Sequence, residues 1–197
     1  MTEPPVAGLL LAAGGGRRLG GAAKALLTFE GRTFVERTAA ALRAAGCDPV
    51  HVVVGAAGDE VRARLDGYTV VANPGWESGM GSSLRAGLAS LDGTGAGGAL
   101  VALVDQPWVG AAAMARVLAA YRSPGTLAQA VYGPRGRGHP VLIGADHFAG
   151  VARAARGDRG ARAYLRERAG EITLVECGDV AAPDDIDEPG DLIDLPQ

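Results

Sequence analysis

A run of glycines followed by three cations is the part of this sequence best suited to binding a charged ligand. The apolar run Val6–Ala12 leads into glycines at residues 14–16, and Arg17, Arg18 and Lys24 follow. Glycine lets the backbone approach an anion closely, so successive N–H groups can converge on phosphate oxygens while cations neutralise charge. The pattern predicts a polyphosphate site, and hence a nucleotide ligand. The alternative is a glycine-rich surface turn, which has no need of three cations.

Two common phosphate-binding loops do not fit this segment. A dinucleotide-binding fingerprint starting at Gly14 needs Gly or Ala at its sixth position, where this sequence has Leu19. A Walker A loop needs Ser or Thr directly after its lysine, whereas Ala25 follows Lys24. We therefore expect a longer cationic loop between a first strand and a helix that begins near Thr33.

The elements that must position this loop alternate along the chain. Short apolar runs at residues 6–12, 49–54, 68–72 and 99–104 predict buried strands, and amphipathic stretches at 33–45, 59–65 and 81–91 predict helices between them. This order predicts an α/β fold with a mostly parallel sheet covered by helices on both faces. Ligands of such sheets bind at the carboxyl ends of the strands, so the glycine loop and Asp105 are expected at one site.

Asp105 directly follows the fourth apolar run and precedes Gln106 and Pro107. A carboxylate beside bound phosphates is repelled unless a divalent cation lies between them, and Mg²⁺ is usually held by one or two carboxylates plus phosphate oxygens. Asp105 is therefore a candidate metal ligand. The alternative is a cap for a helix around residues 111–121.

A second source of carboxylates lies near the C-terminus. Residues 184–191 carry five acidic side chains. Such a density is typical of a solvated turn, but Ile186 and the apolar residues at 192 and 193 would hold the segment against the core. One carboxylate could then point inward as a second metal ligand.

The composition is that of a globular protein. The chain has 197 residues, 48% of them hydrophobic and 21% charged, with a net charge of −3, which predicts one domain over residues 1–197 and no nucleic-acid partner. No apolar run reaches the roughly 18 residues of a membrane span, and the N-terminus lacks the basic start of a secretory signal. We expect a cytoplasmic protein with no membrane partner. Cys47 and Cys177 are expected to be buried free thiols rather than a disulfide or a ligand pair.

Four segments occur in an order that resembles the MobA-like NTP transferase family: residues 11–24, 73–84, 105–107 and 185–192. Residues 138–142 and 157–162 are more similar to its molybdenum cofactor cytidylyltransferases than to its guanylyltransferases. The resemblance implies a three-layer α/β/α, Rossmann-like nucleotidyltransferase fold. It also implies transfer of a nucleoside monophosphate from an NTP, here CTP, to a phosphorylated acceptor, molybdopterin, with release of pyrophosphate. A molybdoenzyme or its chaperone would then receive the product.

The same resemblance implies roles for individual residues. Arg18, Lys24 and Asp105 would be catalytic, and Asp105 and Asp187 would hold Mg²⁺. The nucleotide would contact the glycine loop, its two cations and a segment beside the base and ribose, at Leu11, Ala12, Ala13, Gly14, Gly15, Gly16, Arg18, Lys24, Gly79, Ser82 and Ser83. An acceptor phosphate is already anionic, so catalysis would need alignment and charge cancellation rather than a strong base.

Three other functions stay open at this point. They are nucleotidyl transfer to another small phosphate such as a sugar phosphate, NAD(P)H-dependent reduction as in the similar nicotine blue oxidoreductases, and non-catalytic regulation by a bound nucleotide. Residues 123–170 are expected to build the acceptor half of the cleft. Five side chains there could meet an anion, or lie on a hairpin tip and a solvated helix face: Arg135, Arg137, His139, Arg159 and Arg162.

Overall fold

The computed structural model describes residues 4–16, 20–187 and 189–192. Seven strands of these residues form one sheet in the order β5-β4-β1-β6-β8-β7-β9. Their bounds are β1 (Val6–Ala12), β4 (Val50–Val54), β5 (Thr69–Ala72), β6 (Gly98–Leu103), β7 (Leu127–Val131), β8 (Arg137–Gly144) and β9 (Ile172–Glu176). A separate short hairpin joins β2 (Thr28–Phe29) to β3 (Arg32–Thr33).

The sheet is mostly parallel, as expected. β1 runs parallel to β4 and β6, and β4 runs parallel to β5. In this register Leu11 lies opposite both Val53 and Leu103, so the carboxyl ends of three strands meet at one edge of the sheet. Only β8 among the described strands of this sheet runs antiparallel to its neighbours, pairing with β6 and β7, whereas β9 is parallel to β7.

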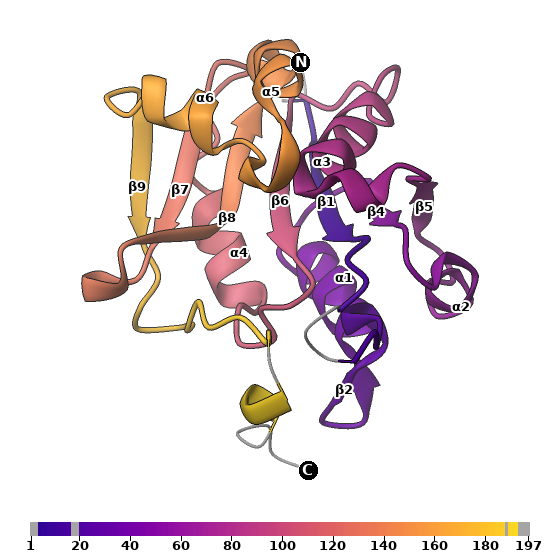
Figure 1. Ribbon diagram of the computed structural model, residues 1–197. Coiled ribbons are helices and arrows are strands. Elements are labelled where there is room, and N and C mark those ends of the chain that lie inside the picture. Colours follow the sequence, from indigo (N-terminus) through magenta and orange to yellow (C-terminus); the bar gives the residue numbers. More distant parts are fainter. Residues whose placement is uncertain (1–3, 17–19, 188, 193–197) are drawn as a thin grey trace.

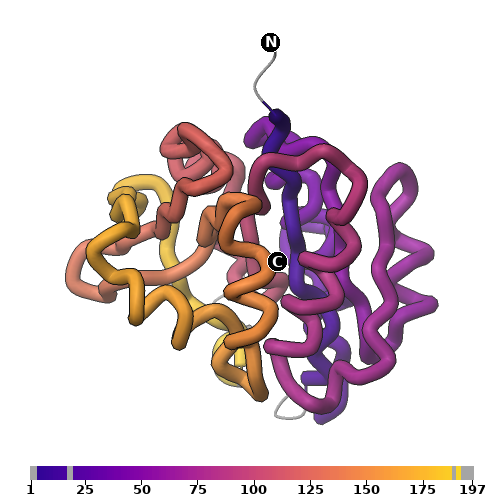
Figure 2. Tube along the Cα trace, turned by 90° about the horizontal axis from the view of Figure 1, so that it is seen from above, coloured from indigo at the N-terminus to yellow at the C-terminus, as the bar shows by residue number. Residues whose placement is uncertain are grey.

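Helices cover both faces of the sheet (Figures 1 and 2), which confirms the three-layer α/β/α architecture. One buried cluster joins the sheet to α1 (Phe34–Ala44), α2 (Gly58–Arg62) and α4 (Ala111–Leu118). The other joins it to α3 (Met80–Ala89), α5 (Phe148–Ala154) and α6 (Arg162–Glu167). Single 3₁₀ turns connect several elements: η2 (Lys24–Leu26), η3 (Trp76–Ser78), η4 (Gly133–Arg135), η5 (Ala145–His147), η6 (Gly157–Arg159) and η7 (Pro189–Leu192).

Local sequence signals account for the start of α1. The side chain of Thr33 accepts a hydrogen bond from the backbone of Glu36, whose carboxylate in turn accepts one from the backbone of Thr33. This capping box satisfies two N–H groups that the first helical turn leaves unpaired. The expected beginning of a helix near Thr33 is confirmed.

The expectation of four buried strands is wrong at one of them. The run at residues 68–72 does form a strand, β5, but it is not buried, because it lies at the edge of the sheet with β4 as its neighbour and its residues are exposed or half-buried.

The cysteines are free and buried, as expected. Within residues 4–16, 20–187 and 189–192, no helix combines the length and the apolar character needed to cross a membrane.

Candidate active site

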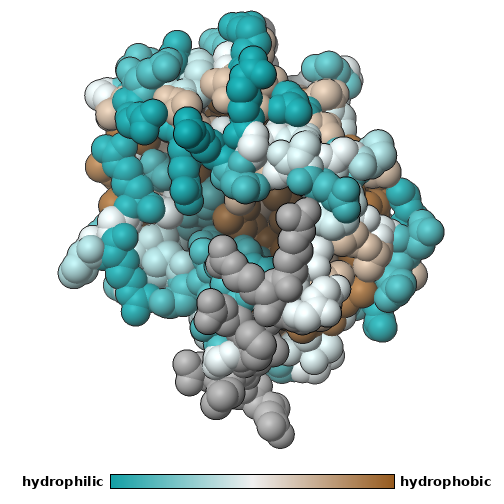
Figure 3. All heavy atoms as spheres, viewed as in Figure 1, coloured by the Kyte–Doolittle hydropathy of each residue, from teal (hydrophilic) through white to brown (hydrophobic). Residues whose placement is uncertain are grey.

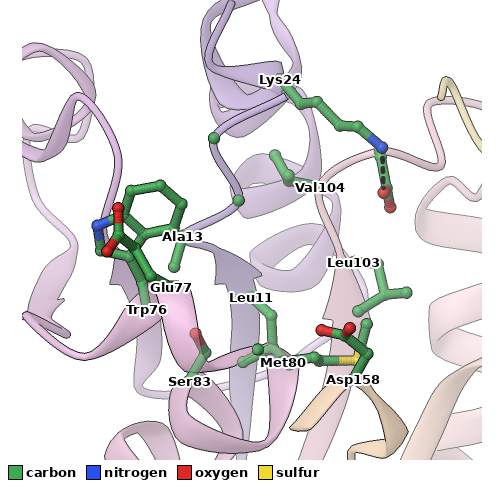
Figure 4. A pocket seen from close by; sticks show the side chains of 14 residues that line it. Leu11, Ala13, Lys24, Trp76, Glu77, Met80, Ser83, Leu103, Val104 and Asp158 are labelled. Carbon is green, nitrogen blue, oxygen red and sulfur yellow. Dashed lines mark hydrogen bonds and ion pairs between the residues drawn. The ribbon is translucent and has the colours of Figure 1, made fainter. Parts of the chain in front are cut away.

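A cleft of about 350 Å³ opens where β1 and β6 end. Figure 3 shows a hollow with an apolar floor on this face of the molecule. In Figure 4, Trp76 and Glu77 lie on one side of the cleft, and Lys24 reaches across the other. The walls come from the end of β1, the turn before α3, the end of β6 and η6: Leu11, Ala13, Gly14, Gly15, Lys24, Trp76, Glu77, Gly79, Met80, Ser83, Leu103, Val104, Asp105 and Asp158.

The three glycines of the loop after β1 have different structural roles. A Cβ on Gly15 would lie 2.7 Å from the ring of Trp76, so only glycine lets the indole pack against the loop. A Cβ on Gly14 would meet no heavy atom within 4 Å, so this position leaves the cleft open. Gly16 has φ +54°, and its Cβ would lie 1.9 Å from the carbonyl oxygen of Ala22. The loop therefore presents backbone to the cleft, as an anion site requires.

A buried asparagine fixes the wall opposite this loop. Asn73 donates hydrogen bonds from Nδ2 to Oγ of Ser82 (2.8 Å) and of Ser83 (3.0 Å), and its Oδ1 accepts one from the backbone of Gly75 (3.0 Å). These bonds tie the turn at residues 73–79 to the first turn of α3. That helix begins after Gly79 at the edge of the cleft, where its unpaired N–H groups favour an anion.

Lys24 joins two carboxylates that are far apart in the sequence. Its Nζ lies 3.0 Å from Oδ2 of Asp105 and also donates to Oδ1 of Asp187. Burial lowers the pKa of Lys24, but the two carboxylates outweigh burial and raise this pKa above its ordinary value of 10.5. The lysine is therefore a cation at neutral pH and is held by two carboxylates at the rim of the cleft.

The segment around Ile186 brings Asp187 to this place. The Ile186 side chain is fully buried, and its backbone N–H donates to the carbonyl oxygen of Asp105 (2.9 Å). Gln106 donates to Oδ1 of Asp185 at 2.7 Å. Burial raises the pKa of Asp185, as do the neighbouring carboxylates of Asp105 and Asp187. The core contact predicted for Ile186 is confirmed, and the acidic segment meets the end of β6.

The carboxylates at this rim are suited to holding a divalent cation together with a substrate. Oδ1 of Asp105 is buried and has no hydrogen-bond partner among the described residues, although the other oxygen of this carboxylate is paired with Lys24. Among the described residues, no group of three or more His, Cys, Asp or Glu side chains is arranged to hold a metal. A cation bound by Asp105 and Asp187 would therefore need further oxygens, and phosphates supply the hard oxygen ligands that Mg²⁺ prefers.

A second, smaller cavity of about 90 Å³ shares Leu11 and Met80 with the cleft. Its polar wall consists of Gln129, Arg137, His139, Arg159 and Arg162. Burial, helped by the charge of Arg162, lowers the pKa of His139 to about 4, so this imidazole is neutral at pH 7.

Arg135 does not belong to this wall. It lies in the loop that joins β7 to β8, and its guanidinium pairs with Asp184. Four of the five side chains expected to meet an anionic acceptor thus line one cavity, and the fifth lies on the hairpin tip.

The structure brings most of the residues expected to bind the nucleotide to the cleft. Leu11, Ala13, Gly14, Gly15, Lys24, Gly79, Ser83 and Asp105 line it. Ala12 is instead buried in the core of β1, Gly16 closes the loop behind the wall, and Ser82 is bonded to Asn73. Arg18 lies outside the described residues. The alternative role of Asp105 as a helix cap is wrong, because Gly110 is the N-cap of α4 and no side chain caps that helix.

Six cleft residues were not selected from the sequence as site residues: Trp76, Glu77, Met80, Leu103, Val104 and Asp158. A signal was present for Trp76, which is an aromatic residue in a turn bounded by Gly75 and Gly79. Asp158 lies between two residues with positive φ, Gly157 and Gly160. A Cβ on Gly79 would lie 2.6 Å from Oδ1 of Asp158, so this glycine lets η6 close against the start of α3.

The chain is similar to known proteins over most of its length. The MobA-like NTP transferase domain matches residues 8–172. The chain is 43% identical over 192 residues, 93% of each chain, to a protein named nicotine blue oxidoreductase from Paenarthrobacter nicotinovorans.

Solved structures extend the comparison. The Rv0371c protein of Mycobacterium tuberculosis H37Rv is 32% identical, with a TM-score of 0.84 over 99% of this chain and 98% of that one. Its complex with manganese gives 29% identity and a TM-score of 0.78 over 97% of each chain. A nucleotidyl transferase from Methanothermobacter thermautotroptrophicus is 26% identical, with a TM-score of 0.81 over 96% of this chain and 94% of that one.

Proposed function

The chain belongs to the MobA-like NTP transferase family, and from this premise we propose that it transfers a nucleoside monophosphate from CTP to a phosphorylated acceptor, molybdopterin, with release of pyrophosphate. The observation that carries the proposal is the convergence of Lys24, Asp105 and Asp187 at the rim of a cleft floored by a glycine loop. A cation and two carboxylates beside a backbone cradle are what a metal-bound triphosphate needs.

In this proposal the triphosphate lies along residues 13–15 with its charge facing Lys24, and Arg18 is expected to bind it as well. The N-terminus of α3 adds a fixed positive partial charge on the other side. Asp105 and Asp187 would hold Mg²⁺, which when bound neutralises phosphate charge and stabilises the charge that develops during transfer. Gly79 and Ser83 lie where the ribose would pass.

The reaction is the attack of an acceptor phosphate oxygen on the α-phosphorus of CTP, and the bond from that phosphorus to the pyrophosphate oxygen breaks. The attacking oxygen is already anionic, so no side chain has to remove a proton. The protein aligns the two phosphates, and Lys24 and Arg18 cancel the charge that grows on the leaving pyrophosphate. The acceptor phosphate would approach from the second cavity, where Arg137, Arg159 and Arg162 surround the neutral His139.

The choice of CTP over GTP rests on Ala13. Its methyl group is part of the cleft wall, and a smaller pyrimidine fits beside it more easily than guanine. A methyl-sized difference is worth about 1–3 kcal/mol in discrimination, so the preference should be partial.

A second candidate function is NAD(P)H-dependent reduction of a conjugated small molecule. Its support is the 43% identity along 93% of both chains to a protein named nicotine blue oxidoreductase. In that case the cleft would hold the phosphates of a nicotinamide nucleotide, and a hydride rather than a nucleotidyl group would leave it.

The deciding experiment measures both reactions on the same purified protein. CTP, GTP, ATP and UTP are each supplied with Mg²⁺ and molybdopterin or a sugar phosphate, and pyrophosphate is measured. In parallel, NADPH and NADH are supplied with a quinoid pigment, and loss of nicotinamide absorbance is followed. We expect pyrophosphate release that needs Mg²⁺ and molybdopterin and is fastest with CTP. Nicotinamide oxidation without pyrophosphate release would replace the proposal with the reductase. Nucleotide binding in a thermal-shift assay without either reaction would indicate a regulator.

A further inference from the structure

Lys24 is the one lysine in the sequence, beside eighteen arginines. Apart from its three histidines, every other basic side chain of the protein is therefore a guanidinium. A guanidinium is a planar fork with five donors, whereas an ammonium is a compact point charge on a flexible four-carbon stem. Position 24 is thus the place where the chain uses the side chain most similar in shape and charge to a single bound cation.

The surroundings of Lys24 are those of a cation site. The lysine side chain is 13% exposed, and its Nζ contacts carboxylate oxygens of Asp105 and Asp187, which lie far apart in the sequence. Asp185 adds a third carboxylate nearby, held by Gln106. Like charges this close repel one another unless a cation lies between them. The ammonium supplies that cation.

In the function proposed above, these groups have two roles that they cannot fulfil while they are bonded to one another. Asp105 and Asp187 are expected to hold a divalent cation, and Lys24 is expected to face the triphosphate. Yet both carboxylates are bonded to the lysine, while Oδ1 of Asp105 stays buried with no hydrogen-bond partner in the described part of the chain. The flexible stem of lysine allows the ammonium to leave the carboxylates when another cation replaces it.

We propose that Lys24 is an internal counter-ion of the metal site, displaced toward the triphosphate when a divalent cation enters between Asp105 and Asp187. This inference rests on the proposed function, because the triphosphate is what receives the released ammonium. The displacement makes tight binding of the divalent cation depend on the nucleotide. The free protein binds divalent cations weakly, and the cation and the nucleotide bind tightly only together. An enzyme of this kind avoids holding a metal ion in a site without substrate.

The first test measures Mn²⁺ affinity without nucleotide, by EPR of free Mn²⁺, in the wild type and in Lys24→Met. Methionine keeps the length of the stem and removes the charge. We expect Lys24→Met to bind Mn²⁺ about tenfold more tightly, since the competing cation is gone. The control is Arg116→Met, which removes one positive charge from a pair with Asp179 outside both cavities and should leave Mn²⁺ affinity unchanged.

With CTP present the two proteins should differ in the opposite direction. Lys24→Met should then bind Mn²⁺ together with CTP more weakly than the wild type, because the triphosphate has lost its ammonium. Equal or weaker Mn²⁺ binding by Lys24→Met in the absence of nucleotide would overturn the proposal. Tighter Mn²⁺ binding by Lys24→Met, together with no pyrophosphate release by the wild type with any acceptor, would leave the counter-ion role standing and reject the proposed function instead.

The second test needs no variant. Lysine labelled with ¹³C at the ε-carbon gives one side-chain signal in this protein, because the sequence contains a single lysine. We expect this signal to move little with CTP alone or with Mg²⁺ alone at concentrations that leave the site unfilled, and to move when Mg²⁺ and CTP are added together. A signal that stays unchanged with Mg²⁺ and CTP bound would contradict the displacement. Arg116→Met, labelled in the same way, should repeat the wild-type response.

Discussion

The cavities beside the two halves of the sheet are lined by different kinds of groups. Around β1, β4 and β6, which are parallel, the cleft is walled by backbone at residues 13–15, by the start of α3 and by one charge cluster. Around β7 and β8, where the strands are antiparallel, the wall consists of long side chains, three arginines and a histidine. In the proposed function, the first half would bind its ligand through the path of the main chain, and the second through side chains that a few substitutions could exchange.

If the two halves bind their ligands as proposed, this difference would account for one family including proteins named for different reactions. A backbone cradle requires glycine at fixed places, as at Gly15 against Trp76, so it changes little when the reaction partner changes. The arginine wall can be altered without disturbing the core. We therefore expect substitutions in the first half to affect every reaction of the protein, and those in the second half to affect one substrate only.

The largest effect is expected at Asp105. Asp105→Asn should lower kcat/KM for nucleotidyl transfer about 1,000-fold, because the divalent cation expected between this carboxylate and the phosphates loses a charged ligand. The fold should persist, with a melting temperature within about 3 °C of the wild type, since an amide replaces a carboxylate of equal size. The control is Asp184→Asn, an exposed carboxylate paired with Arg135. Near-normal pyrophosphate release by Asp105→Asn, or its unfolding, would reject the metal role.

The next effect separates the two halves directly. Arg162→Ala should raise KM for the phosphorylated acceptor about 30-fold, as expected for one lost charge-assisted hydrogen bond, and leave KM for CTP unchanged. Steady-state kinetics with each substrate varied in turn measures both values. Arg135→Ala, which alters the hairpin tip outside the cavity, serves as the control. If KM for CTP rose as much as KM for the acceptor, the two halves would not be separate sites.

A smaller and more specific effect is expected at Ala13. Ala13→Gly should shift the ratio of kcat/KM for CTP over GTP about tenfold toward GTP, because a methyl group leaves the wall beside the base. Competition between the two nucleotides with the same acceptor measures this ratio. A preference of the wild type for GTP would reject the cytidylyl assignment while leaving nucleotidyl transfer in place.

The smallest effect concerns stability in the second half. The pKa of His139 is lowered from 6.5 to about 4 by burial and by Arg162. Between these two pH values the imidazole is therefore protonated in the unfolded chain and neutral in the folded protein. The stability that this neutral imidazole provides is present above pH 6.5 and is lost as the pH falls toward 4, by about 1–2 kcal/mol because the ring is partly open to water.

Urea unfolding at several pH values measures this loss. His139→Gln should flatten the difference in unfolding free energy between pH 7 and pH 4 relative to the wild type. His51, whose pKa burial also lowers, stays in both proteins, so its contribution cancels. A pH dependence that His139→Gln leaves unchanged would show that His139 titrates as an exposed residue.

Much of the first half follows from the sequence alone. The apolar run at residues 6–12 is β1, the helix expected from Thr33 begins there, and Asp105 follows the fourth predicted strand. These features depend on neighbouring residues: the length of an apolar run, the period of an amphipathic helix and a capping side chain three residues from its partner. Local patterns of this kind survive in any tertiary context.

Tertiary structure decided the rest. The antiparallel course of β8, the edge position of β5 and the packing of Trp76 on Gly15 depend on which segments meet, and sequence periodicity carries no such information. The same is true of the charge cluster, in which Lys24 is 81 residues from Asp105 and 163 residues from Asp187. The sequence determined which side chains were available for chemistry, whereas the buried contact of Ile186 beside β6 decided which of five acidic residues would meet the lysine.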